Sequence, residues 1–317
     1  VVLCSYIFRS DAAGLPVVAA LLRAHRRGVE VRVLLDGVGA GYFRSPTVAR
    51  LADAGVPVAR FLHSWLPWRM PLLNLRLHKK ILVVDGRIGF TGGMNIGAEN
   101  LARNHREGRG VRDIQFRIEG PVVADLAASF EQDWRFSQGR PPRPRPDDAA
   151  PPAPAGAALA RGIQSGPDED FMKIEATLIG AINAARSRIY IVTPYFLPDR
   201  TLHMALAFAA LRGVAVDIVI PVRSNYPVID WSTRAQIGTL IERGCRVHLS
   251  EPPFDHAKIM TVDGVWSLIG SANWDVRSLR LNFEFDLEIW DRRFTGEIDG
   301  VVEGKMAGGQ RLVREDL

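Results

Sequence analysis

LHKKILVVDGRIGFTGGMN, the stretch Leu77–Asn95, is written a second time as DHAKIMTVDGVWSLIGSAN, the stretch Asp255–Asn273. Each copy carries a histidine, a lysine, an aspartate and an asparagine at relative positions 0, +2, +7 and +17. They are His78, Lys80, Asp85 and Asn95 in the first copy and, 178 residues later, His256, Lys258, Asp263 and Asn273 in the second. A period of this length indicates a domain duplication. The shared polar residues predict that each half supplies one half of a single site.

Each copy predicts a β-hairpin. Its histidine and lysine are two residues apart, so on a strand they project from the same face. The residues that follow, Ile81–Val84 and Ile259–Val262, are apolar and mostly β-branched, which is typical of a buried strand. An Asp-Gly dipeptide then predicts a turn, and Arg87–Thr91 and Val265–Ile269 are predicted to return as second strands. A buried strand has no packing reason to begin with His-x-Lys, so the mouth of each hairpin is a candidate site.

Strands and helices alternate in both halves, which predicts an α/β fold with a mostly parallel sheet in each half. The first half is predicted to contain strands Val1–Phe8, Val29–Asp36 and Val56–Phe61 and helices Leu15–Arg27 and Thr47–Ala54. The second is predicted to contain helices Asp168–Ala185, Leu202–Leu211 and Ile229–Glu242 and strands Arg188–Thr193, Val214–Val222 and Cys245–Ser250. We expect the sheets to pack across a pseudo-two-fold axis, with both His-x-Lys mouths facing one cleft.

The chain divides into two predicted domains, residues 1–138 and 166–317, joined by a linker at 139–165. Most of this linker, residues 139–161, is rich in proline, alanine and arginine and cannot pack a core, so it is predicted to be a surface excursion or disordered. The stretch Gly304–Leu317 is predicted to be an irregular tail. The chain starts without methionine, directly in a predicted strand, which suggests a fragment of a longer protein.

Composition bounds the class of partner. A formal net charge of +5 and a pI near 9.5 favour an anionic partner, either nucleic acid or an acidic membrane surface, without choosing between them. The two cysteines, Cys4 and Cys245, lie in apolar strand-like stretches, so a reducing compartment is expected and a disulfide framework is not. No cysteine–histidine cluster has zinc spacing and no acidic loop suits calcium, so we predict no metal and no cofactor.

Two His-x-Lys-x4-Asp motifs in one chain resemble the phospholipase D superfamily, and within it the match is closest to bacterial cardiolipin synthases. The other stretches that carry the resemblance are NLRLHKK (74–80), RD (112–113), TPYFLPD (193–199) and SANWDVRSLRLNFE (271–284). It implies two pseudo-symmetric phospholipase D-like α-β-α sandwich domains that share one active-site cleft. It also implies a bacterial inner-membrane location, with the catalytic domains on the cytoplasmic side and an anchor upstream. Leu77 departs from the family, which often has a polar residue before the histidine.

Metal-free cleavage of a phosphodiester needs a nucleophile, a proton donor for the leaving alkoxide and positive charge around the phosphoryl oxygens. One neutral imidazole can attack phosphorus and form a phosphohistidine, while the other, protonated, gives its proton to the leaving group. The resemblance implies that His78 is the nucleophile and His256 the acid and then the base, although the near-identity of the two motifs leaves this order open. The expected donors to the phosphoryl oxygens are Lys80, Lys258, Asn95, Asn273 and, as a lesser candidate, Ser271.

Each histidine also needs a carboxylate on its other ring nitrogen to fix its tautomer. The candidates are Asp113 and Glu284, which lie 35 and 28 residues after the motif histidines of their own halves. Asp85 and Asp263 belong to the six-residue catalytic motif set, but their place in a hairpin turn predicts a structural role. Two arginines could contact a second phosphate or form surface ion pairs: Arg277 and Arg280.

The acceptor of the phosphatidyl group decides the predicted activity. Transfer to a second phosphatidylglycerol makes cardiolipin and glycerol, whereas transfer to water makes a phospholipase D-type hydrolase. We favour the first because LNFE and TPYFLPD resemble the cardiolipin synthase subfamily. The extra loop Leu62–Arg76, with Trp65 and Trp68 among aliphatic and basic residues, is typical of an element that dips into a membrane interface, the alternative being that it caps the core. The expected partner is therefore phosphatidylglycerol, an anionic phospholipid, at a membrane surface.

Two other hypotheses remain. A soluble phosphodiesterase or nuclease fits the basic pI, but the sequence shows no aromatic stacking platform and no basic stripe beyond the linker, so nucleic acid is not favoured. A non-catalytic anionic-lipid-binding protein is the third hypothesis. Pure binding would not require both imidazoles, so two intact His-x-Lys pairs argue against it. The sequence does not indicate an oligomeric state.

Overall fold

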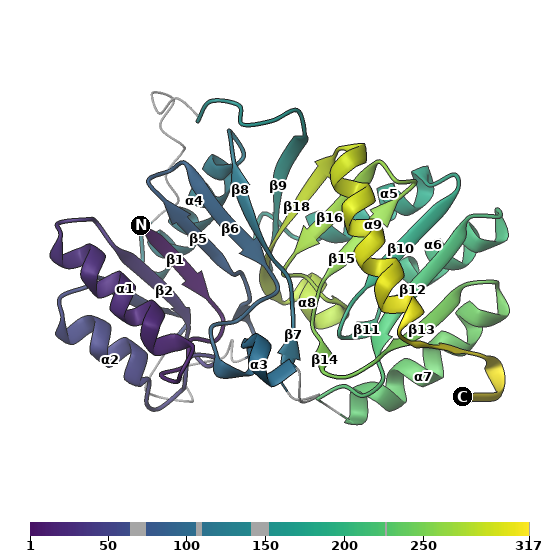
Figure 1. Ribbon diagram of the computed structural model, residues 1–317, viewed down its shortest axis with the longest axis horizontal. Helices are drawn as coiled ribbons and strands as arrows, with labels where there is room; N and C mark the ends of the chain where they lie inside the picture. The colour runs from purple at the N-terminus through teal and green to yellow at the C-terminus, as the bar shows by residue number, and fades with distance from the viewer. Residues whose placement is uncertain (64–73, 106–109, 141–151, 226, 317) are drawn as a thin grey trace.

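The computed structural model describes residues 1–63, 74–105, 110–140, 152–225 and 227–316. Two α/β halves lie side by side, the first at the left of Figure 1 and the second at the right. One cluster of buried apolar side chains draws members from both halves, among them Phe61 and Phe130 from the first and Phe283 and Phe285 from the second. The halves therefore share a core instead of touching only at their surfaces.

The first half is built on a sheet with strand order β3-β2-β1-β5-β6-β8. Neighbouring side chains on its strands alternate between two cores, because successive residues of a strand face opposite sides. Leu3 packs with α1 and α2, whereas Cys4 packs in the shared core with α4. The elements are β1 Val2–Ser5, α1 Gly14–Arg26, β2 Arg32–Asp36, α2 Pro46–Asp53, β3 Val58–Phe61, β4 Arg76–Leu77, β5 Ile81–Val84, β6 Ile88–Gly92, η2 Ala98–Asn100, α3 Ala102–His105, β7 Val111–Arg112, β8 Gln115–Glu119 and α4 Val123–Ser137.

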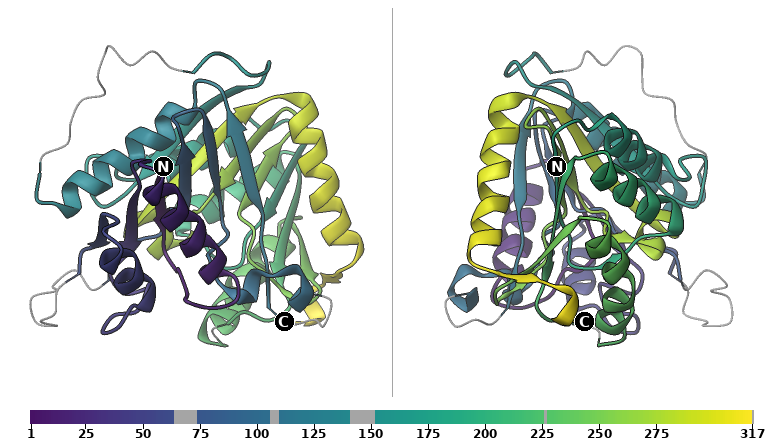
Figure 2. Two further views of the ribbon diagram at one scale, coloured as in Figure 1. Left: turned by 60° about the vertical axis from the view of Figure 1, so that its left-hand side comes forward. Right: turned by 90° about the vertical axis from the view of Figure 1, so that its right-hand side faces the viewer.

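The second half repeats this plan on a larger sheet, β19-β13-β12-β10-β15-β16-β18-β4, with β9 also paired to β18. Figure 2 shows α9 on one face of this sheet and the helices α5, α6 and α7 on the other. The elements are β9 Leu159–Ser165, α5 Lys173–Ala184, β10 Arg188–Val192, β11 Phe196–Leu197, α6 Arg200–Leu211, β12 Ala215–Pro221, α7 Pro227–Glu242, β13 Arg246–Ser250, β14 Phe254–Asp255, β15 Ile259–Val262, β16 Trp266–Gly270, β17 Trp274–Asp275, α8 Val276–Arg280, β18 Asn282–Trp290, α9 Arg292–Ala307, β19 Gln310–Leu312 and η3 Arg314–Asp316.

The α/β class is confirmed, but the expectation of mostly parallel sheets is wrong. The strands that alternate with helices are parallel: β1 with β2 and β2 with β3, and β10 with β12 and β12 with β13. The motif hairpins then add antiparallel strands, β5–β6 and β15–β16. A two-residue turn can join only antiparallel neighbours, so the Asp-Gly turns themselves make each sheet mixed.

Both motif turns have the backbone that their sequence predicts. The φ angles are 53° at Asp85 and 65° at Gly86, and 52° at Asp263 and 66° at Gly264. Positive φ at both central residues is typical of the type I′ hairpin turn, which favours Asp-Gly. The turn fixes the register of each hairpin, and with it the place of the histidine at the other end of the first strand.

Short strands tie the halves together next to the motif histidines. β4 of the first half runs parallel to β18 of the second, with Leu77 opposite Phe283. β7 of the first half runs parallel to β14 of the second, with Arg112 opposite Asp255. His78, Asp113 and His256 directly follow β4, β7 and β14, and Glu284 is the third residue of β18. The pairing of these strands therefore brings all four residues to the boundary between the halves. This exchange is what positions the site.

Two predicted irregular segments contain regular structure. Leu159–Ser165, at the end of the predicted linker, forms β9 and pairs antiparallel with seven residues of β18. The predicted tail Gly304–Leu317 holds the last turn of α9 and the strand β19, which pairs with β13. Both stretches gain backbone hydrogen bonds from a neighbouring strand, and a local composition argument does not detect such long-range pairing.

The centre of the predicted membrane-dipping loop, residues 64–73 with Trp65 and Trp68, lies outside the described residues. So does the arginine-rich part of the predicted linker, residues 141–151. Across the ranges that the structure covers, no helix combines the length and the apolar character needed to cross a bilayer.

Candidate active site

Each motif histidine is held at its backbone by the opposite half of the molecule. The amide of His78, just before β5, donates to the carbonyl of Phe283 at 2.9 Å. The amide of His256, just before β15, donates to the carbonyl of Arg112 at 2.7 Å. Both side chains are almost fully buried, with 6% and 9% of their residue surface exposed. The two hairpins therefore present their histidines where the halves meet.

The carboxylate partners of the histidines are exchanged between the halves. Glu284 lies 2.9 Å from Nδ1 of His78, and Asp113 lies 2.6 Å from Nδ1 of His256. The sequence interpretation paired each histidine with the carboxylate of its own half, and that pairing is wrong. Glu284 lies on β18, which runs beside β4, and Asp113 follows β7, which runs beside β14. The bridging strands thus carry each carboxylate across.

Wider electrostatic contacts join the two histidines in one cluster. Lys258 and Asp113 act on His78, and Lys80 acts on His256. Lys80 and Lys258 also act on one another. Charged groups of each motif therefore influence the histidine of the other motif, as expected if the duplicated motifs form one site.

Glu284 is completely buried and is surrounded by donors. Its carboxylate accepts hydrogen bonds from Ser271 Oγ at 2.6 Å, Ser278 Oγ at 2.5 Å and Asn282 Nδ2 at 3.1 Å, in addition to His78. Burial raises the pKa of Glu284, while Lys80 and these hydrogen bonds oppose the rise. An ionised carboxylate can only accept hydrogen bonds, so Glu284 accepts from Nδ1–H of His78 as it does from the other three donors.

Ser271 therefore does not fit its predicted role as a phosphoryl donor. Its hydroxyl is committed to Glu284, and it also accepts from the amide of Phe285 at 3.0 Å. Ser278, which the sequence interpretation missed, has the same target. The signal was present in SANWDVRSLRLNFE, because two serines precede a buried carboxylate there, but their convergence depends on the turn at α8.

Asp113 has an environment unlike that of Glu284. Although burial opposes it, Lys258 and the hydrogen bond with His256 hold the pKa of Asp113 below its usual value. Lys258 Nζ also lies 2.7 Å from Nδ1 of His256. A lysine ammonium can only donate hydrogen bonds, whereas an ionised carboxylate can only accept them. The hydrogen on Nδ1 of His256 therefore points to Asp113 and not to Lys258. Lys258 then donates to the carbonyl of His256.

Both imidazoles are neutral in this environment. Burial, followed by the charge of the neighbouring lysines, lowers the pKa of His78 well below its usual value and that of His256 to about 4. With the proton on Nδ1, each Nε2 carries the free lone pair. The site thus contains a nucleophilic nitrogen at each histidine, and an approaching anion favours protonation of either imidazole.

The two motif lysines are buried beside the histidines. Lys80 Nζ donates to the carbonyl of His78 at 2.6 Å. Burial lowers the pKa of Lys80 to about 7 and that of Lys258 to about 8. Glu284 and Asp113 oppose this lowering, and an anion bound beside the two lysines would favour their charged forms further.

A tyrosine flanks each histidine, Tyr6 just after β1 and Tyr195 just before β11, and the sequence interpretation missed both. The ring centroids of Tyr6 and His78 are 5.1 Å apart, and those of Tyr195 and His256 are 6.3 Å apart, each pair edge to face. The ring of Tyr6 also lies 5.4 Å from Lys80 Nζ.

The two motif asparagines differ. Asn95 Oδ1 accepts from the amide of Ile7 at 3.4 Å, so it braces the loop that carries Tyr6. Asn273 is buried, and within the described ranges its Oδ1 atom has no hydrogen-bond partner. Asn273 is thus the better placed of the two for contact with a substrate.

Asp85 and Asp263 do not reach the reacting groups. They lie at the opposite ends of β5 and β15 from the histidines, which contradicts their place in the catalytic set and agrees with a structural role. The Asp263 carboxylate accepts from the amides of Arg186, Ser187 and Arg188 at 2.8–2.9 Å. It therefore anchors the start of β10 to the hairpin turn.

The two candidate arginines make different contacts. Arg280 is paired with Asp199 and with the buried Glu175, so the ion-pair alternative describes it. Arg277 donates to the carbonyl of Asn74 at 3.4 Å and thereby touches the segment that leads to the first motif. Neither contact involves the histidines.

The duplicated histidine–carboxylate geometry can be compared with known proteins. A family model described as "Cardiolipin synthase, PLD-like domain" matches residues 1–134 and 178–305. The chain belongs to this cardiolipin synthase, phospholipase D-like family. The two matched segments correspond to the two structural halves, and the gap between them contains the stretch predicted as a linker.

Other members of the cardiolipin synthase family resemble the chain over most of its length. A cardiolipin synthase of Oceanobacillus iheyensis is 34% identical over 98% of this chain and 64% of its own. Cardiolipin synthase A of Pseudomonas putida is 35% identical over 98% of this chain and 64% of its own. The major cardiolipin synthase of Bacillus subtilis is 36% identical over 90% of this chain and 59% of its own. The chain thus spans less than two thirds of the length of these relatives.

Solved structures show the same fold in more distant proteins. The phosphatidylserine synthase of Haemophilus influenzae covers 98% of this chain with a TM-score of 0.73 and 18% identity. The polyphosphate kinase of Porphyromonas gingivalis covers 99% of it with a TM-score of 0.64 and 17% identity. The phospholipase D-like fold of two pseudo-symmetric halves is therefore established for this member of the cardiolipin synthase family.

Proposed function

We propose that this chain is the catalytic part of a cardiolipin synthase-type phosphatidyltransferase. It condenses two phosphatidylglycerol molecules to cardiolipin and glycerol through a covalent phosphohistidine. The observation that carries the proposal is the exchanged pairing of His78 with Glu284 and of His256 with Asp113 in a single charge cluster. Similarity to cardiolipin synthases over nearly the whole chain supports the choice of substrate.

In the first step, Nε2 of His78 attacks the phosphorus of phosphatidylglycerol. The bond from phosphorus to the headgroup glycerol oxygen breaks, and protonated His256 gives that oxygen its proton. Glycerol leaves, and the phosphatidyl group stays on His78. Glu284 accepts the hydrogen bond from Nδ1–H and thereby stabilises the positive charge that develops on the attacking ring.

In the second step, neutral His256 takes the proton from a headgroup hydroxyl of a second phosphatidylglycerol. The hydroxyl oxygen attacks phosphorus, the phosphorus–nitrogen bond breaks, and cardiolipin leaves with His78 restored. One residue thus acts as the acid in the first step and the base in the second. Binding of the anionic phosphoryl group raises the proton affinity of His256 above that of the empty site, because an opposite charge within a few ångström favours the protonated ring.

Lys80, Lys258 and Asn273 are proposed to surround the phosphoryl oxygens. Donors that are already fixed in a buried site stabilise developing charge without reorganising, and the loss of one typically costs about 10²–10³ in rate. Burial of both lysines near the histidines supports this role. The anionic partner is proposed to be phosphatidylglycerol at the inner membrane of a bacterium, met from the cytoplasmic side.

Incubation with phosphatidylglycerol in vesicles and in detergent micelles, followed by separation of the lipid products, tests the proposal. Cardiolipin together with an equal amount of glycerol supports it. Phosphatidic acid as the main product assigns a hydrolase, and cleavage of DNA with no lipid turnover assigns a nuclease. If His78→Ala and His256→Ala both bind vesicles and behave as the parent protein does, the chain is a lipid-binding protein and not an enzyme.

A further inference from the structure

Asp286 is a buried carboxylate beneath the active site that the proposed reaction does not use. It is 3% exposed and lies on β18, two residues after Glu284. Its Oδ1 atom accepts hydrogen bonds from the backbone amides of Ser271 at 2.8 Å and Ala272 at 3.1 Å. A Cβ on Gly270 would approach this Oδ1 atom to 2.2 Å, so a glycine is needed for the carboxylate to reach the loop.

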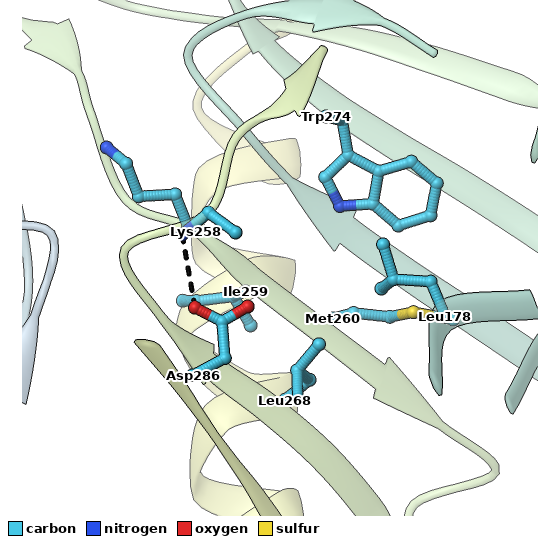
Figure 3. A pocket seen from close by; sticks show the side chains of 8 residues that line it. Leu178, Lys258, Ile259, Met260, Leu268, Trp274 and Asp286 are labelled. Carbon is cyan, nitrogen blue, oxygen red and sulfur yellow. Dashed lines mark hydrogen bonds between the residues drawn. The ribbon is translucent and has the colours of Figure 1, made fainter. Parts of the chain in front are cut away.

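A small pocket separates Asp286 from the apolar core of the second half. Its lining includes Lys258, Met260, Leu268, Trp274 and Asp286. In Figure 3 Lys258 and Asp286 border one side of the space, with the Lys258 side chain extending away from the carboxylate, and Trp274, Met260 and Leu268 border the other. A carboxylate with apolar walls on one side exerts its charge on the other, and here the other side is the motif lysine.

The pseudo-symmetric position in the first half is occupied by an uncharged residue. In the second half Gly270 pairs with Asp286 across β16 and β18. In the first half the equivalent glycine, Gly92, pairs with Gln115 across β6 and β8. The residue before each motif histidine differs in the same sense, since Asp255 is buried and charged where the first half has Leu77. Burial lowers the pKa of Lys258, and four carboxylates oppose it, in decreasing order Asp113, Glu284, Asp255 and Asp286.

We propose that Asp286 is a positioning residue that makes the two halves chemically unequal, by holding the proton on the Lys258 and His256 side of the site. Asp255 is already neutralised by the buried ammonium of Lys305, on α9. Asp286 instead bonds only neutral backbone amides in the described contacts, so no ion pair neutralises its negative charge, and that charge acts on Lys258. This inference rests on the proposed function, because it names the half that supplies the acid.

The groups that face Asp286 support this assignment. Glu284 on the same strand and Lys258 at the start of β15 are the charged side chains that act on it. The elements packed around it contribute the apolar side chains of Ile163 from β9 and Leu178 from α5. Burial, reinforced by Glu284, raises the pKa of Asp286 to about 7, while the amides of Ala272 and Ser271 oppose the rise. The carboxylate is therefore protonated in acid and ionised just above neutrality.

Asp286→Asn tests the inference, because the amide oxygen can still accept from Ser271 and Ala272 while the charge is removed. Below pH 7 the parent carboxylate is mostly protonated, so the variant should turn over phosphatidylglycerol within about twofold of the parent. Above pH 7 the variant should fall progressively behind, because Lys258 and His256 lose their protons at lower pH without the carboxylate. The alkaline limb of kcat against pH should thus move to lower pH.

Two further measurements separate this charge effect from a structural one. Gln115→Glu places a carboxylate at the equivalent position of the first half and should move the limb in the opposite direction. The pKa of the Lys258 ammonium, followed by ¹⁵N-lysine NMR and assigned with Lys258→Met, should be lower in Asp286→Asn than in the parent. This NMR result does not depend on turnover, so it stands or falls separately from the proposed lipid reaction. Equal loss of activity at every pH with an unchanged Lys258 pKa overturns the inference.

Discussion

Glu284 of the second half binds Nδ1 of His78 of the first half at 2.9 Å, and this bond places the two halves in one chemical unit. The mirror bond runs from Asp113 to His256 at 2.6 Å. Neither histidine is therefore complete within its own half, although each motif is complete in sequence. Because each half supplies the carboxylate for the histidine of the other half, removal of either half would leave the remaining histidine without its partner.

Glu284→Gln should lower kcat far more than it changes KM. The amide can donate to Nδ1 as well as accept, so it permits the tautomer in which Nε2 carries the proton and cannot attack. In the serine protease triad the corresponding carboxylate-to-amide change costs about 10⁴ in kcat. We expect a loss on the order of 10³–10⁴ here. Steady-state kinetics measure the change, and a loss confined to KM would contradict it.

Asp113→Asn should affect a different part of the reaction. It weakens the hold on His256, the proposed acid, and leaves the nucleophile paired with Glu284. A substrate whose leaving group needs no proton should therefore be cleaved by Asp113→Asn almost as fast as by the parent, and phosphatidylglycerol much more slowly. Comparison of the two substrates at one pH provides the measurement. Equal losses for both would show that Asp113 acts on the whole site.

Asp263→Ala should destabilise the protein without removing activity from the folded fraction. The substitution leaves three backbone amides of the segment 186–188 without their acceptor and puts alanine at a φ of 52°. The expected cost is about 1–3 kcal/mol in the free energy of unfolding, measured with urea. Asp263→Asn, which tolerates positive φ and keeps one acceptor, is the matched control and should lose less. A large loss of kcat at full stability would restore Asp263 to the catalytic set.

Stability should rise with pH on the alkaline side of neutrality because of the motif lysines. Their pKa values are lowered by burial to about 7 and about 8 in the folded protein, against about 10.4 in an unfolded chain. Between these values the unfolded state binds more protons than the folded state, so the free energy of unfolding increases with pH. Urea unfolding at pH 7 and pH 9.5 measures the difference. Lys80→Met with Lys258→Met should abolish it, and its persistence in that variant would place its origin elsewhere.

Phe283→Ala should unfold both halves together at a lower temperature. The Phe283 ring lies 4.8 Å from that of Phe61, edge to face, in the core that both halves share. Truncation of a buried phenylalanine costs about 3–5 kcal/mol. Calorimetry should show one transition that moves as a whole. Two separate transitions, with only one of them shifted, would show that the halves fold independently.

The sequence contained enough to locate the site but not to assemble it. The repeat at His78 and His256, the Asp-Gly turns and the alternation of strands and helices are local patterns, and the structure confirms the elements that they predict. The exchange of Glu284 and Asp113 depends on the short strands β4, β7 and β14, which pair only across the two halves. The two-residue periodicity of a strand shows on which face each side chain lies, but it does not show which strand is the neighbour. The roles of Ser271 and Asp286 were missed for the same reason, because their partners lie 13 to 15 residues away on a neighbouring strand.

A substrate with a good leaving group gives the most direct test that two imidazoles from opposite halves act on one phosphorus atom. Phosphatidyl-p-nitrophenol needs no proton donor for its leaving group, so His256→Ala should release one equivalent of p-nitrophenolate in a burst. Mass spectrometry of the quenched protein should then find the phosphatidyl group on the peptide that contains His78. His78→Ala should give no burst. A burst of equal size from His78→Ala, or an adduct on a residue other than the two motif histidines, would contradict the account.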